Sequence, residues 1–516
     1  MQEIKRILGL IILSGVIVGG VYIFFQKTEA VKEITFSTSD AKGLKGEISI
    51  ALDSWIGYFY FKSPVFGTMM RDEGYRIKVI DDKADYPERM KMLKDGEIDF
   101  AVCTVDSYLL NGKSVKYPGA VIAVLDESKG GDAIVAWKDS VQNIEALKIK
   151  QKFTIAFTPA SPSEHLLKAI SSHFDIPLFT SGDKKWRVEV NGAEEGYEKL
   201  MKRGVDCAAL WEPHVTEALS DPGVVKLIGS EDIENLIVDI LLVNRNFAKQ
   251  KPELVFLFLK KYFETMNYYC SSPARLKQDI TAHLSIPEKR VEYMLKGVKW
   301  INYAENTSWF GITTKGQHKQ PEIVDAINST LKILIANKDF SANPLIDSDP
   351  YTIINSAFIA SLYGGGAQQI GEGAASDQSL NRRFAQIPDS EWLSLSVVGS
   401  LKIRPVTFRS GTSLIDDGGQ EQVKEIVESI RHYPNFRILV KGHSGLKGDM
   451  SANSELSRVR AEAVKKIFVT SYGMDPNRIR TNGVGSGEPL SRLPDESERE
   501  YDNRLKRVEV MLLTEK

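Results

Sequence analysis

The sequence predicts an α/β protein with three parts: a long two-lobed α/β region, a smaller βα-repeat domain after it, and an N-terminal transmembrane helix. Three observations support this prediction. The chain has 516 residues, which is more than one domain usually holds. Its middle alternates short apolar strands with amphipathic helices, a pattern typical of open, parallel-rich sheets. Its two ends differ, with an uncharged apolar run at the start and renewed strand and helix patterns in the last hundred residues.

Residues 1–30 predict a membrane anchor. The run from Ile7 to Phe25 has no charge and no proline, and as a helix it would reach about 28 Å, near the ~30 Å of a bilayer's hydrocarbon core. Lys5 and Arg6 precede it, so the positive-inside tendency puts the N-terminus in the cytoplasm. A cleaved signal peptide is the alternative, but the run is long for one and no clear Ala-x-Ala site follows. We therefore expect a single-pass inner-membrane protein with most of its chain in the periplasm.

Composition argues against two classes of function. A net charge of −2 leaves no electrostatic footprint for nucleic acid. The three cysteines, Cys103, Cys207 and Cys270, imply no disulfide framework, and no Cys/His cluster has metal-ligand spacing. Cys103 and Cys207 lie in apolar, strand-like segments and are interpreted as small core residues. We expect neither a metal nor a cofactor.

Residues 45–345 are predicted to form the two lobes. Lobe one is expected to comprise residues 45–135 and 240–345, and lobe two residues 136–239, with helical patterns in Pro252–Trp300 packing behind lobe one. Open α/β sheets bind ligands at the carboxyl ends of their strands, so a cleft between the lobes is the expected site. The first strand patterns are Gly46–Trp55, Arg76–Asp81, Phe100–Thr104, Ala120–Asp126 and Ala133–Trp137.

Four short motifs occur in order in this region. They are WIGY from Trp55, DGEIDFAVCTVDS from Asp95, LDESKGGDAIVA from Leu125 and GVDCAALWEP from Gly204. In them the chain resembles the periplasmic solute-binding proteins of ABC transporters for nitrate, sulfonate, taurine and thiamine precursors. The resemblance implies a type II two-lobed periplasmic-binding-protein fold that closes on a small molecule by hinge motion. It also implies an ABC permease or a signalling protein as the partner.

Aromatic residues follow the ends of two strands, one in each lobe. Trp55 and Tyr58 come after the first strand, where they would either sandwich a flat or apolar ligand or cover the core. Trp211 and Glu212 end the matching strand of lobe two and are expected to face them. All four are predicted ligand-binding residues.

Six polar residues complete the predicted ligand site. Ser161 and Ser163 lie in a pattern that predicts a capping box with proline at the first helical position, and such a helix start also attracts anions. Ser107 suits a helix cap and Asp132 a turn, so both have structural alternatives. The six are Thr104, Asp106, Ser107, Asp132, Ser161 and Ser163.

The charge of this set indicates the chemistry of the ligand. Asp106, Asp132 and Glu212 are acidic, and no lysine or arginine stands at an expected contact position. A bare inorganic anion usually needs a cationic or helix-terminal partner, although backbone amides alone can hold one. The set therefore favours a neutral or amine-bearing heterocycle, or a zwitterion, over nitrate.

Residues 364–390 are rich in glycine and poor in large apolar residues, and they predict a flexible linker. Residues 395–516 follow as the smaller βα-repeat domain. In its helix Ser451–Val464, a guanidinium at Arg460 falls inside an apolar stripe, where it would either bind a carboxylate or lie over its own helix face. The stripe comprises Leu456, Val459, Ala463, Val464 and Ile467.

This domain resembles the OmpA-like peptidoglycan-binding domains. The motifs are the GHS loop, LSRVRA, NRIRTNGVGSGEPL from Asn477 and the closing RLKRVEV. The family's aspartate takes the ammonium of diaminopimelate and its LSxxRA arginine takes the carboxylate. Arg460 matches that arginine, whereas Gly445 stands at the aspartate position and Asp449 is a candidate substitute. The resemblance implies peptidoglycan binding by His443, Asn453, Arg460 and Arg507.

Three functions follow from these patterns. The leading hypothesis is a membrane-tethered binding protein that captures a small molecule and associates with the cell wall. An envelope scaffold with a degenerate ligand site is the alternative, distinguished by a cleft that side chains fill. An enzyme is not expected, because no nucleophile–base pair is present and His165 and His214 follow turns, where they would be solvated or capping.

Overall fold

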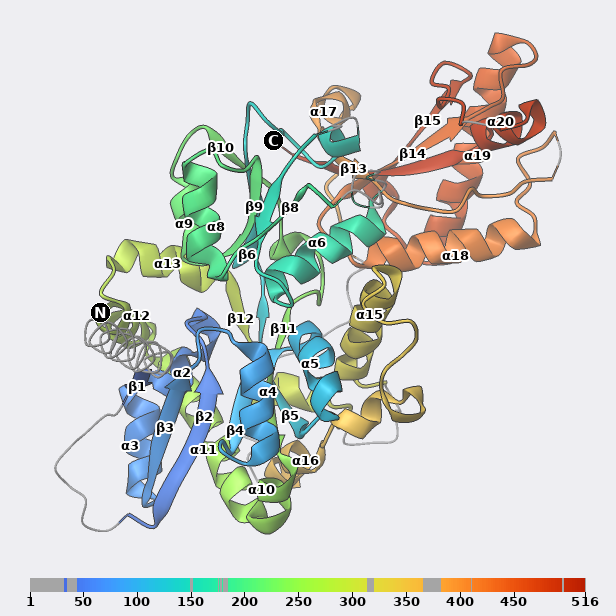
Figure 1. The fold of residues 1–516 in the computed structure, drawn as a ribbon. Coiled ribbons are helices and arrows are strands. Elements are labelled where there is room, and N and C mark those ends of the chain that lie inside the picture. The colour runs from blue at the N-terminus through green and yellow to red at the C-terminus, as the bar shows by residue number, and fades with distance from the viewer. Residues whose placement is uncertain are drawn as a thin grey trace, which may run out of the picture.

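The computed structural model describes residues 32–34, 44–148, 152–174, 176, 179, 184–312, 320–364, 382–409, 411–493 and 496–515. These residues form sheets of seven, five and four strands, with helices packed on them (Figure 1). The first two sheets are the cores of the two lobes, and the third belongs to the C-terminal domain. The predicted membrane span Ile7–Phe25 and residues 365–381 of the predicted linker lie outside the described residues.

Lobe one is built on the sheet β1-β3-β2-β4-β11-β5-β12. Strand β2 runs parallel to β3 and β4, and β11 runs antiparallel between β4 and β5. The central strands β4, β5 and β11 are buried along their whole length, which explains their continuous apolar sequences. The strands are β1 (Lys32–Ile34), β2 (Gly46–Leu52), β3 (Tyr75–Asp81), β4 (Phe100–Thr104), β5 (Gly119–Ser128), β11 (Val238–Asn244) and β12 (Val298–Trp300).

Helices cover both faces of this sheet. Prolines at the first turn start α3, α11 and α12, where the missing N–H costs nothing. Phe258 of α11 stacks on Phe100 of β4 with ring centroids 4.0 Å apart, which fixes the long helix to the sheet. The helices are η1 (Ile56–Tyr58), α2 (Phe59–Lys62), α3 (Pro64–Asp72), α4 (Tyr86–Asp95), α5 (Val105–Gly112), η2 (Lys113–Val115), α10 (Arg245–Gln250), α11 (Pro252–Ser271), α12 (Pro273–Leu284), α13 (Glu288–Lys296), α14 (Tyr303–Trp309), α15 (Glu322–Ala336), η5 (Ile346–Ser348), η6 (Pro350–Ile353) and α16 (Ala357–Gly364).

Lobe two repeats the strand order of lobe one. Its sheet runs β10-β6-β9-β7-β8, with β7 parallel to β8 and β9, and with β6 antiparallel between β9 and β10. The strand that enters from the other lobe, β11 in lobe one and β6 in lobe two, occupies the same place in each sheet. This confirms the predicted two-lobed α/β architecture. The elements are β6 (Asp132–Trp137), η3 (Glu145–Lys148), β7 (Ile155–Phe157), α6 (Pro162–His173), β8 (Arg187–Glu189), α8 (Gly192–Met201), β9 (Cys207–Trp211), α9 (His214–Leu219), β10 (Val224–Gly229) and η4 (Ser230–Asp232).

Two crossings join the lobes, at residues 128–132 and 229–238. The first crossing packs against Trp55 so closely that a Cβ at Gly131 would overlap the indole ring. Its neighbour Gly130 has a φ of +108°, a backbone conformation that L side chains rarely adopt. The glycine pair therefore lets the chain turn between the lobes directly over a predicted ligand-binding residue.

The C-terminal domain has the sheet β13-β16-β14-β15, in which β14 and β15 are parallel. Strand β16 pairs antiparallel with both β13 and β14. Helices α18 and α19 pack along this sheet (Figure 1). The elements are α17 (Asp389–Ser394), β13 (Ser396–Ser400), α18 (Asp417–Arg431), β14 (Arg437–His443), α19 (Met450–Thr470), η7 (Pro476–Arg478), β15 (Ile479–Gly485), α20 (Glu498–Leu505) and β16 (Val508–Thr514).

The buried face of α19 differs from the predicted stripe. A Cβ at Gly442 would overlap the backbone of Ser457, and one at Gly483 would overlap that of Arg458. The helix backbone therefore lies directly on two glycines of β14 and β15, which rotates the buried face by one residue. That face comprises Ser457, Arg460, Ala461, Val464 and Phe468, while Leu456, Val459, Ala463 and Ile467 are half-buried.

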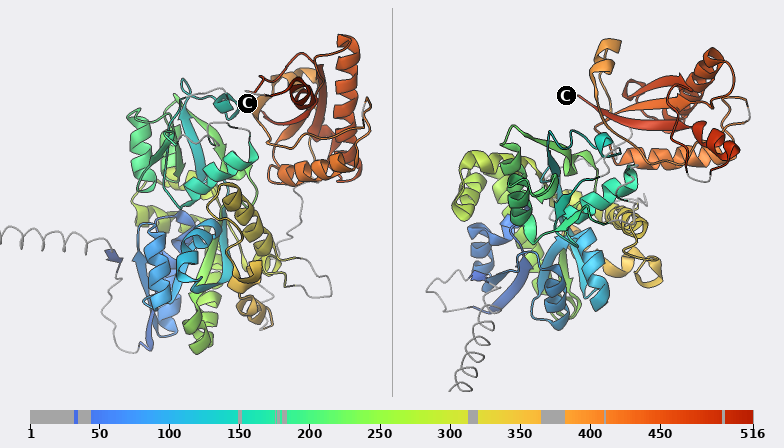
Figure 2. Two further views of the ribbon diagram at one scale, coloured as in Figure 1. Left: turned by 45° about the vertical axis from the view of Figure 1, so that its right-hand side comes forward. Right: turned by 45° about the horizontal axis from the view of Figure 1, so that its top comes forward.

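The C-terminal domain packs directly against lobe two, as the turned views show (Figure 2). Phe174, just after α6, forms an antiparallel bridge with Leu401, just after β13. The backbone N–H of Lys402 donates to the carbonyl of His173 at 2.7 Å. Part of the predicted linker is packed as well, because the N–H of Phe384 donates to Asp475 at 2.9 Å. The described residues 382–390 of the predicted linker thus include a segment that contacts the C-terminal domain.

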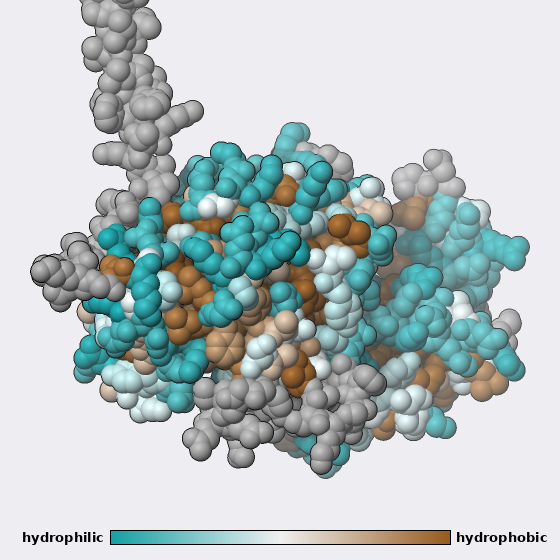
Figure 3. Space-filling view, turned by 90° about the horizontal axis from the view of Figure 1, so that it is seen from below, coloured by the Kyte–Doolittle hydropathy of each residue, from teal (hydrophilic) through white to brown (hydrophobic). Residues whose placement is uncertain are grey.

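Hydrophobic and hydrophilic side chains are mixed on the outer surface. Seen from below lobe one, brown residues gather near the middle of the larger body and teal residues surround them (Figure 3). Within the described ranges, no helix combines the length and the apolar character needed to cross a membrane.

Candidate functional site

A cavity of about 270 Å³ lies between the two lobes. Five of the ten predicted ligand-binding residues line it: Trp55, Tyr58, Thr104, Asp132 and Trp211. They come from the ends of β2 and β4 in lobe one, from β9 in lobe two and from the first crossing. The strand ends of the two sheets thus converge on one open space, as the fold predicts.

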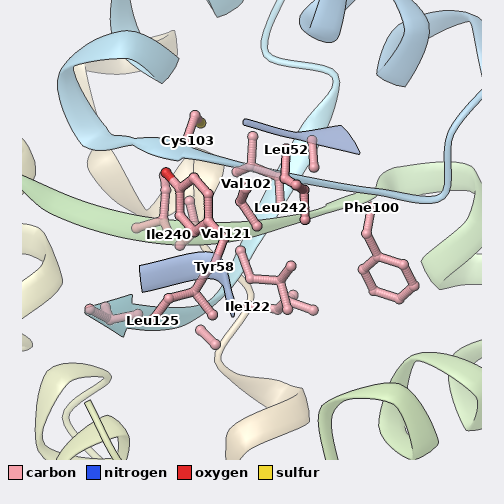
Figure 4. Close-up of a cluster of buried hydrophobic side chains, with 14 of the residues drawn as sticks. Leu52, Tyr58, Phe100, Val102, Cys103, Val121, Ile122, Leu125, Ile240 and Leu242 are labelled. Carbon is pink, nitrogen blue, oxygen red and sulfur yellow. The ribbon is translucent and has the colours of Figure 1, made fainter. Parts of the chain in front are cut away.

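The lobe-one aromatics both line the cavity and cover the core. Tyr58 is 1% exposed, and its ring lies among aliphatic side chains of β4, β5 and β11 (Figure 4). Its hydroxyl donates to Asp239, and burial together with the Asp239 charge raises the pKa of the phenol well above its usual value. The Trp55 indole Nε1–H donates to Asp126 at 3.1 Å. Both rings are therefore fixed in place by buried carboxylates.

Buried carboxyl groups surround the floor of the cavity. Asp132 is 3% exposed and accepts a hydrogen bond from Ser128 at 2.6 Å, while burial and nearby acidic groups raise its pKa to about 7. Asp126 and Asp239 are direct cross-strand partners on β5 and β11. Burial raises the pKa of Asp126 to about 7 and that of Asp239 well above its usual range. Three buried carboxyl groups, those of Asp126, Asp132 and Asp239, therefore lie near the base of the cavity, where little water reaches them.

Positive charge near the cavity is mostly compensated. Arg89 is fully buried behind it and pairs with Asp53 at 3.1 Å and with Asp82. Lys83 lines the cavity, which corrects the expectation that no lysine or arginine stands at the site. His214 also lines it, and its Nδ1 lies 2.6 Å from Glu217.

Three predicted ligand residues turn away from the cavity. The Ser161 hydroxyl donates to the carbonyl of Thr158 at 2.7 Å, so it does not cap α6 and the predicted capping box is wrong. Pro162 nevertheless occupies the first turn and lines the cavity. Ser163 accepts from the Thr158 N–H at 3.0 Å. Glu212 accepts from the N–H and hydroxyl of Thr216, at 3.1 and 2.6 Å.

The remaining two predicted residues lie beneath the cavity wall. Ser107 accepts from the Thr104 hydroxyl at 2.8 Å, and Asp106 is 1% exposed with its Oδ1 unpaired among the described residues. His165 is also buried, at 1% exposure, and burial lowers its pKa. It is therefore neither solvated nor capping, contrary to expectation.

Several residues that line the cavity were not predicted from the sequence. Asp53 could have been predicted, because it directly follows β2 just as Asp106 follows β4. Tyr86 and Glu194 lie on helices whose orientation the sequence does not give. Asp239 is the second residue of β11, and its pairing with Asp126 brings it to the site.

The four predicted peptidoglycan-binding residues all contact other groups of the C-terminal domain. Arg460 donates to the carbonyl of Thr412 at 3.1 Å, with its guanidinium 5.0 Å from the Phe408 ring centroid. His443 and Arg507 both approach Glu509, with N···O distances of 3.3 and 2.7 Å. Asn453, at the start of α19, donates to the carbonyl of Lys447 at 3.0 Å.

The side chain of Asp502 occupies the space beside Gly445. A Cβ added at Gly445 would overlap the carboxylate of Asp502, which lies on α20 and pairs with Lys506. Asp449, the candidate substitute, caps α19 by accepting from the N–H of Ala452 at 2.9 Å. A carboxylate from α20, that of Asp502, therefore lies beside position 445, where this chain has no side chain.

Comparison with known proteins supports the C-terminal assignment. Residues 407–503 match the OmpA family. The outer membrane protein Omp38 of Acinetobacter baumannii is 30% identical over 86 residues, 17% of this chain and 24% of that protein. The peptidoglycan-associated lipoprotein of Brucella melitensis is 29% identical over 86 residues, 17% of this chain and 51% of that protein. The chain therefore spans about a quarter to a half of the length of these relatives and carries an OmpA domain at its C-terminus.

The two lobes have solved structural neighbours. The alkanesulfonate-binding protein SsuA of Xanthomonas axonopodis pv. citri, bound to MOPS, shares 14% identity at a TM-score of 0.44, over 57% of this chain and 93% of that one. A periplasmic sulfonate-binding protein SsuA of Methylobacillus flagellatus KT shares 15% identity at a TM-score of 0.47, over 65% of this chain and 99% of that one.

The expectation of a single-pass inner-membrane location is corrected. The described ranges contain no helix that could span a membrane, and the predicted span lies outside them. The relatives of the C-terminal domain include outer membrane proteins.

Proposed function

We propose that this protein is a binding protein whose two lobes close on a small organic molecule, and that its OmpA domain associates with peptidoglycan. One observation carries the ligand-binding half: Trp55, Thr104 and Trp211 converge from both lobes on an open cavity of about 270 Å³. That volume is close to the lower end of ligand cavities, about 300 Å³. A degenerate scaffold would instead have side chains filling its cleft. The protein forms or breaks no bond; it presents the ligand to an ABC permease or a signalling partner.

A thermal-shift screen of the full chain tests ligand capture. The panel comprises sulfonates, nitrate, pyrimidines, amines and amino acids. A ligand at about one hundred times its Kd stabilises the folded state by about 2.7 kcal/mol, so we expect a shift of several degrees. Trp211→Ala should abolish the shift, because the half-buried indole lines the cavity. Tyr351→Ala, at a 54% exposed aromatic far from the cleft, is the control and should keep it. A thermal shift that persists in Trp211→Ala would show that the ligand binds at another site.

The peptidoglycan half rests on the two charged groups of the C-terminal site. Arg460 is held against Phe408 with only its Nε–H bonded among the described residues, which leaves its terminal nitrogens for a carboxylate. Asp502 offers a carboxylate beside Gly445, where the family's aspartate would take an ammonium. The two together restore both halves of the contact with a zwitterion.

Sedimentation with purified peptidoglycan sacculi tests this half. Arg460→Ala is expected to weaken retention at least about tenfold, since a desolvated charged contact is worth more than 1.4 kcal/mol. Asp502→Asn should act in the same direction. Arg458→Ala, an exposed neighbour on α19 that pairs only with Glu455 in the described part of the chain, is the matched control and should bind like the wild type. Equal retention of the Arg460 variant and the wild type would remove this half of the proposal.

A further inference from the structure

We propose that the cleft ligand is an organic cation, an ammonium group carrying apolar substituents, held between the Asp132 carboxylate and the aromatic side chains of the two lobes. This inference rests on the proposed function and specifies the chemical class of the captured molecule.

Asp132 supplies the charged contact. It is 97% buried, lines the cavity and uses one oxygen, Oδ2, to accept from Ser128. Among the described residues, no hydrogen bond reaches its other oxygen. Because Asp132 lines the cavity, this second oxygen is free to contact an ammonium N–H or a cationic methyl group there.

Four aromatic rings supply the apolar contact: Trp55, Tyr58, Tyr86 and Trp211 line the same cavity. Trp211 is the direct cross-strand partner of Asp132, so an indole and this carboxylate stand side by side on the β6–β9 ladder. The faces of aromatic rings attract cations, most strongly when water is excluded. A carboxylate beside several rings is the arrangement that suits a substituted ammonium group.

The charges around the cavity oppose an anion. Its described lining holds five carboxyl groups, of which Asp53 is paired with Arg89, so four stand against the single ammonium of Lys83 and the imidazole of His214. Arg89 adds no attraction for an anion, because its guanidinium is already bound by Asp53 and Asp82. The carboxyl groups are Asp53, Asp81, Asp132, Glu194 and Asp239.

Proton release should accompany binding of the cation. The pKa of Asp132 is about 7 in the empty cleft, where Asp106, Asp126 and Glu212 are the charged groups that raise it beyond the effect of burial. A bound cation favours the ionised form and lowers that pKa, so the complex holds fewer protons than the free protein below about pH 7. Affinity therefore rises with pH.

Isothermal titration of the full chain with choline and its neutral isostere 3,3-dimethylbutan-1-ol is the test, with butylamine and ethanesulfonate as further probes. We expect choline or butylamine to bind, and the neutral alcohol to bind at least about 100-fold more weakly than choline. For choline, whose charge does not titrate, affinity should be about 20-fold lower at pH 5.5 than at pH 7.5 if one group of pKa 7 must ionise. The heat of binding should vary with the ionisation enthalpy of the buffer, as proton release requires.

Two variants distinguish the site from its surroundings. Asp132→Asn keeps the shape of the side chain, and it should weaken choline at least tenfold and remove most of the pH dependence. Glu198→Gln changes an exposed carboxylate of the same helix α8 that pairs with Lys202 and does not line the cavity, and it should leave both unchanged. The buffer dependence of the wild-type heat provides the same information if the Asp132 variant fails to fold.

The outcomes separate this inference from the proposed function. Binding of ethanesulfonate without binding of either cation would overturn the cation assignment and leave the binding-protein function intact. Equal affinity for choline and the neutral alcohol would also overturn it, because the charge would then contribute nothing. If none of these probes binds and the wider thermal-shift panel gives no hit, the proposed function fails, and the cation assignment fails with it.

Discussion

Replacing Arg89 by methionine is expected to lower the free energy of unfolding of lobe one by about 3–5 kcal/mol. The side chain is 0% exposed, and its guanidinium donates to Asp53 and Asp82 and to the carbonyl of Val102. Both aspartates are 6% exposed, so methionine would leave two buried carboxylates without their counter-charge. The measurement is urea unfolding of the full chain at pH 7, followed by far-UV circular dichroism.

The loss should be smaller in acid. Burial raises the pKa of Asp82, and Arg89 acts in the opposite direction, so removal of Arg89 should raise that pKa further above its unfolded value near 4. Ionisation of Asp82 then destabilises the folded variant as pH rises above about 4, so the difference from the wild type should shrink at pH 4.5. Arg76→Met is the control, because its pair with Glu47 is about 40% exposed and worth at most about 1 kcal/mol. A loss of less than 1 kcal/mol for Arg89→Met would show that Lys62, which donates to the Asp53 carbonyl, already compensates the pair.

The architecture could be predicted because burial leaves a direct trace in the sequence. The apolar run Phe100–Thr104 was predicted as a strand and forms β4 with the same bounds. Strands buried on both faces read as continuous apolar segments, whatever their order in the sheet. The helix start at Pro162 was predicted from proline geometry, and α6 begins there.

Most of the predicted residues that line the cavity lie at or just after strand ends, whereas Asp132 was predicted from its place in a turn and begins β6. Trp55, Thr104 and Trp211 have such strand-end positions and line the cavity. The contact between Asp126 and Asp239 depends on the register between two strands more than a hundred residues apart, which local patterns do not encode. Ser161 failed for a local reason, because its hydroxyl had two competing partners and bonded backward to Thr158 instead of capping α6.

The domain interface was also invisible to sequence patterns. A glycine-rich segment predicted a flexible linker between the domains, yet Phe174, Leu401 and Tyr433 belong to one buried cluster that joins lobe two to the C-terminal domain. The imidazole Nδ1 of His173 lies 2.6 Å from the Tyr433 hydroxyl, and the Ser400 N–H donates to Glu145 at 2.9 Å. Helix α6 thus begins at the cavity with Pro162 and ends at the C-terminal domain. A rigid link between the cleft and the C-terminal OmpA domain follows from this packing.

Phe174→Ala is expected to break that link. The side chain is 1% exposed, its ring lies 5.6 Å from that of Tyr433, and truncating such a phenylalanine costs about 3–5 kcal/mol. In the wild type, lobe two and the C-terminal domain should unfold in one calorimetric transition. In the variant the C-terminal domain should unfold separately, and small-angle X-ray scattering should show a larger radius of gyration.

A second variant tests the interface without removing a side chain from lobe two. A Cβ at Gly399 would lie 2.6 Å from the Phe174 ring, so Gly399→Val should displace the two domains while each keeps its own core. Leu414→Ala, at a 59% exposed residue of the C-terminal domain, should change neither the scattering nor the calorimetric trace. If Phe174→Ala and Gly399→Val both retain the wild-type radius of gyration and a single transition, the polar contacts at His173 and Glu145 hold the domains together on their own. If both variants release the C-terminal domain, apolar packing around Phe174 is what couples the ligand cleft to it.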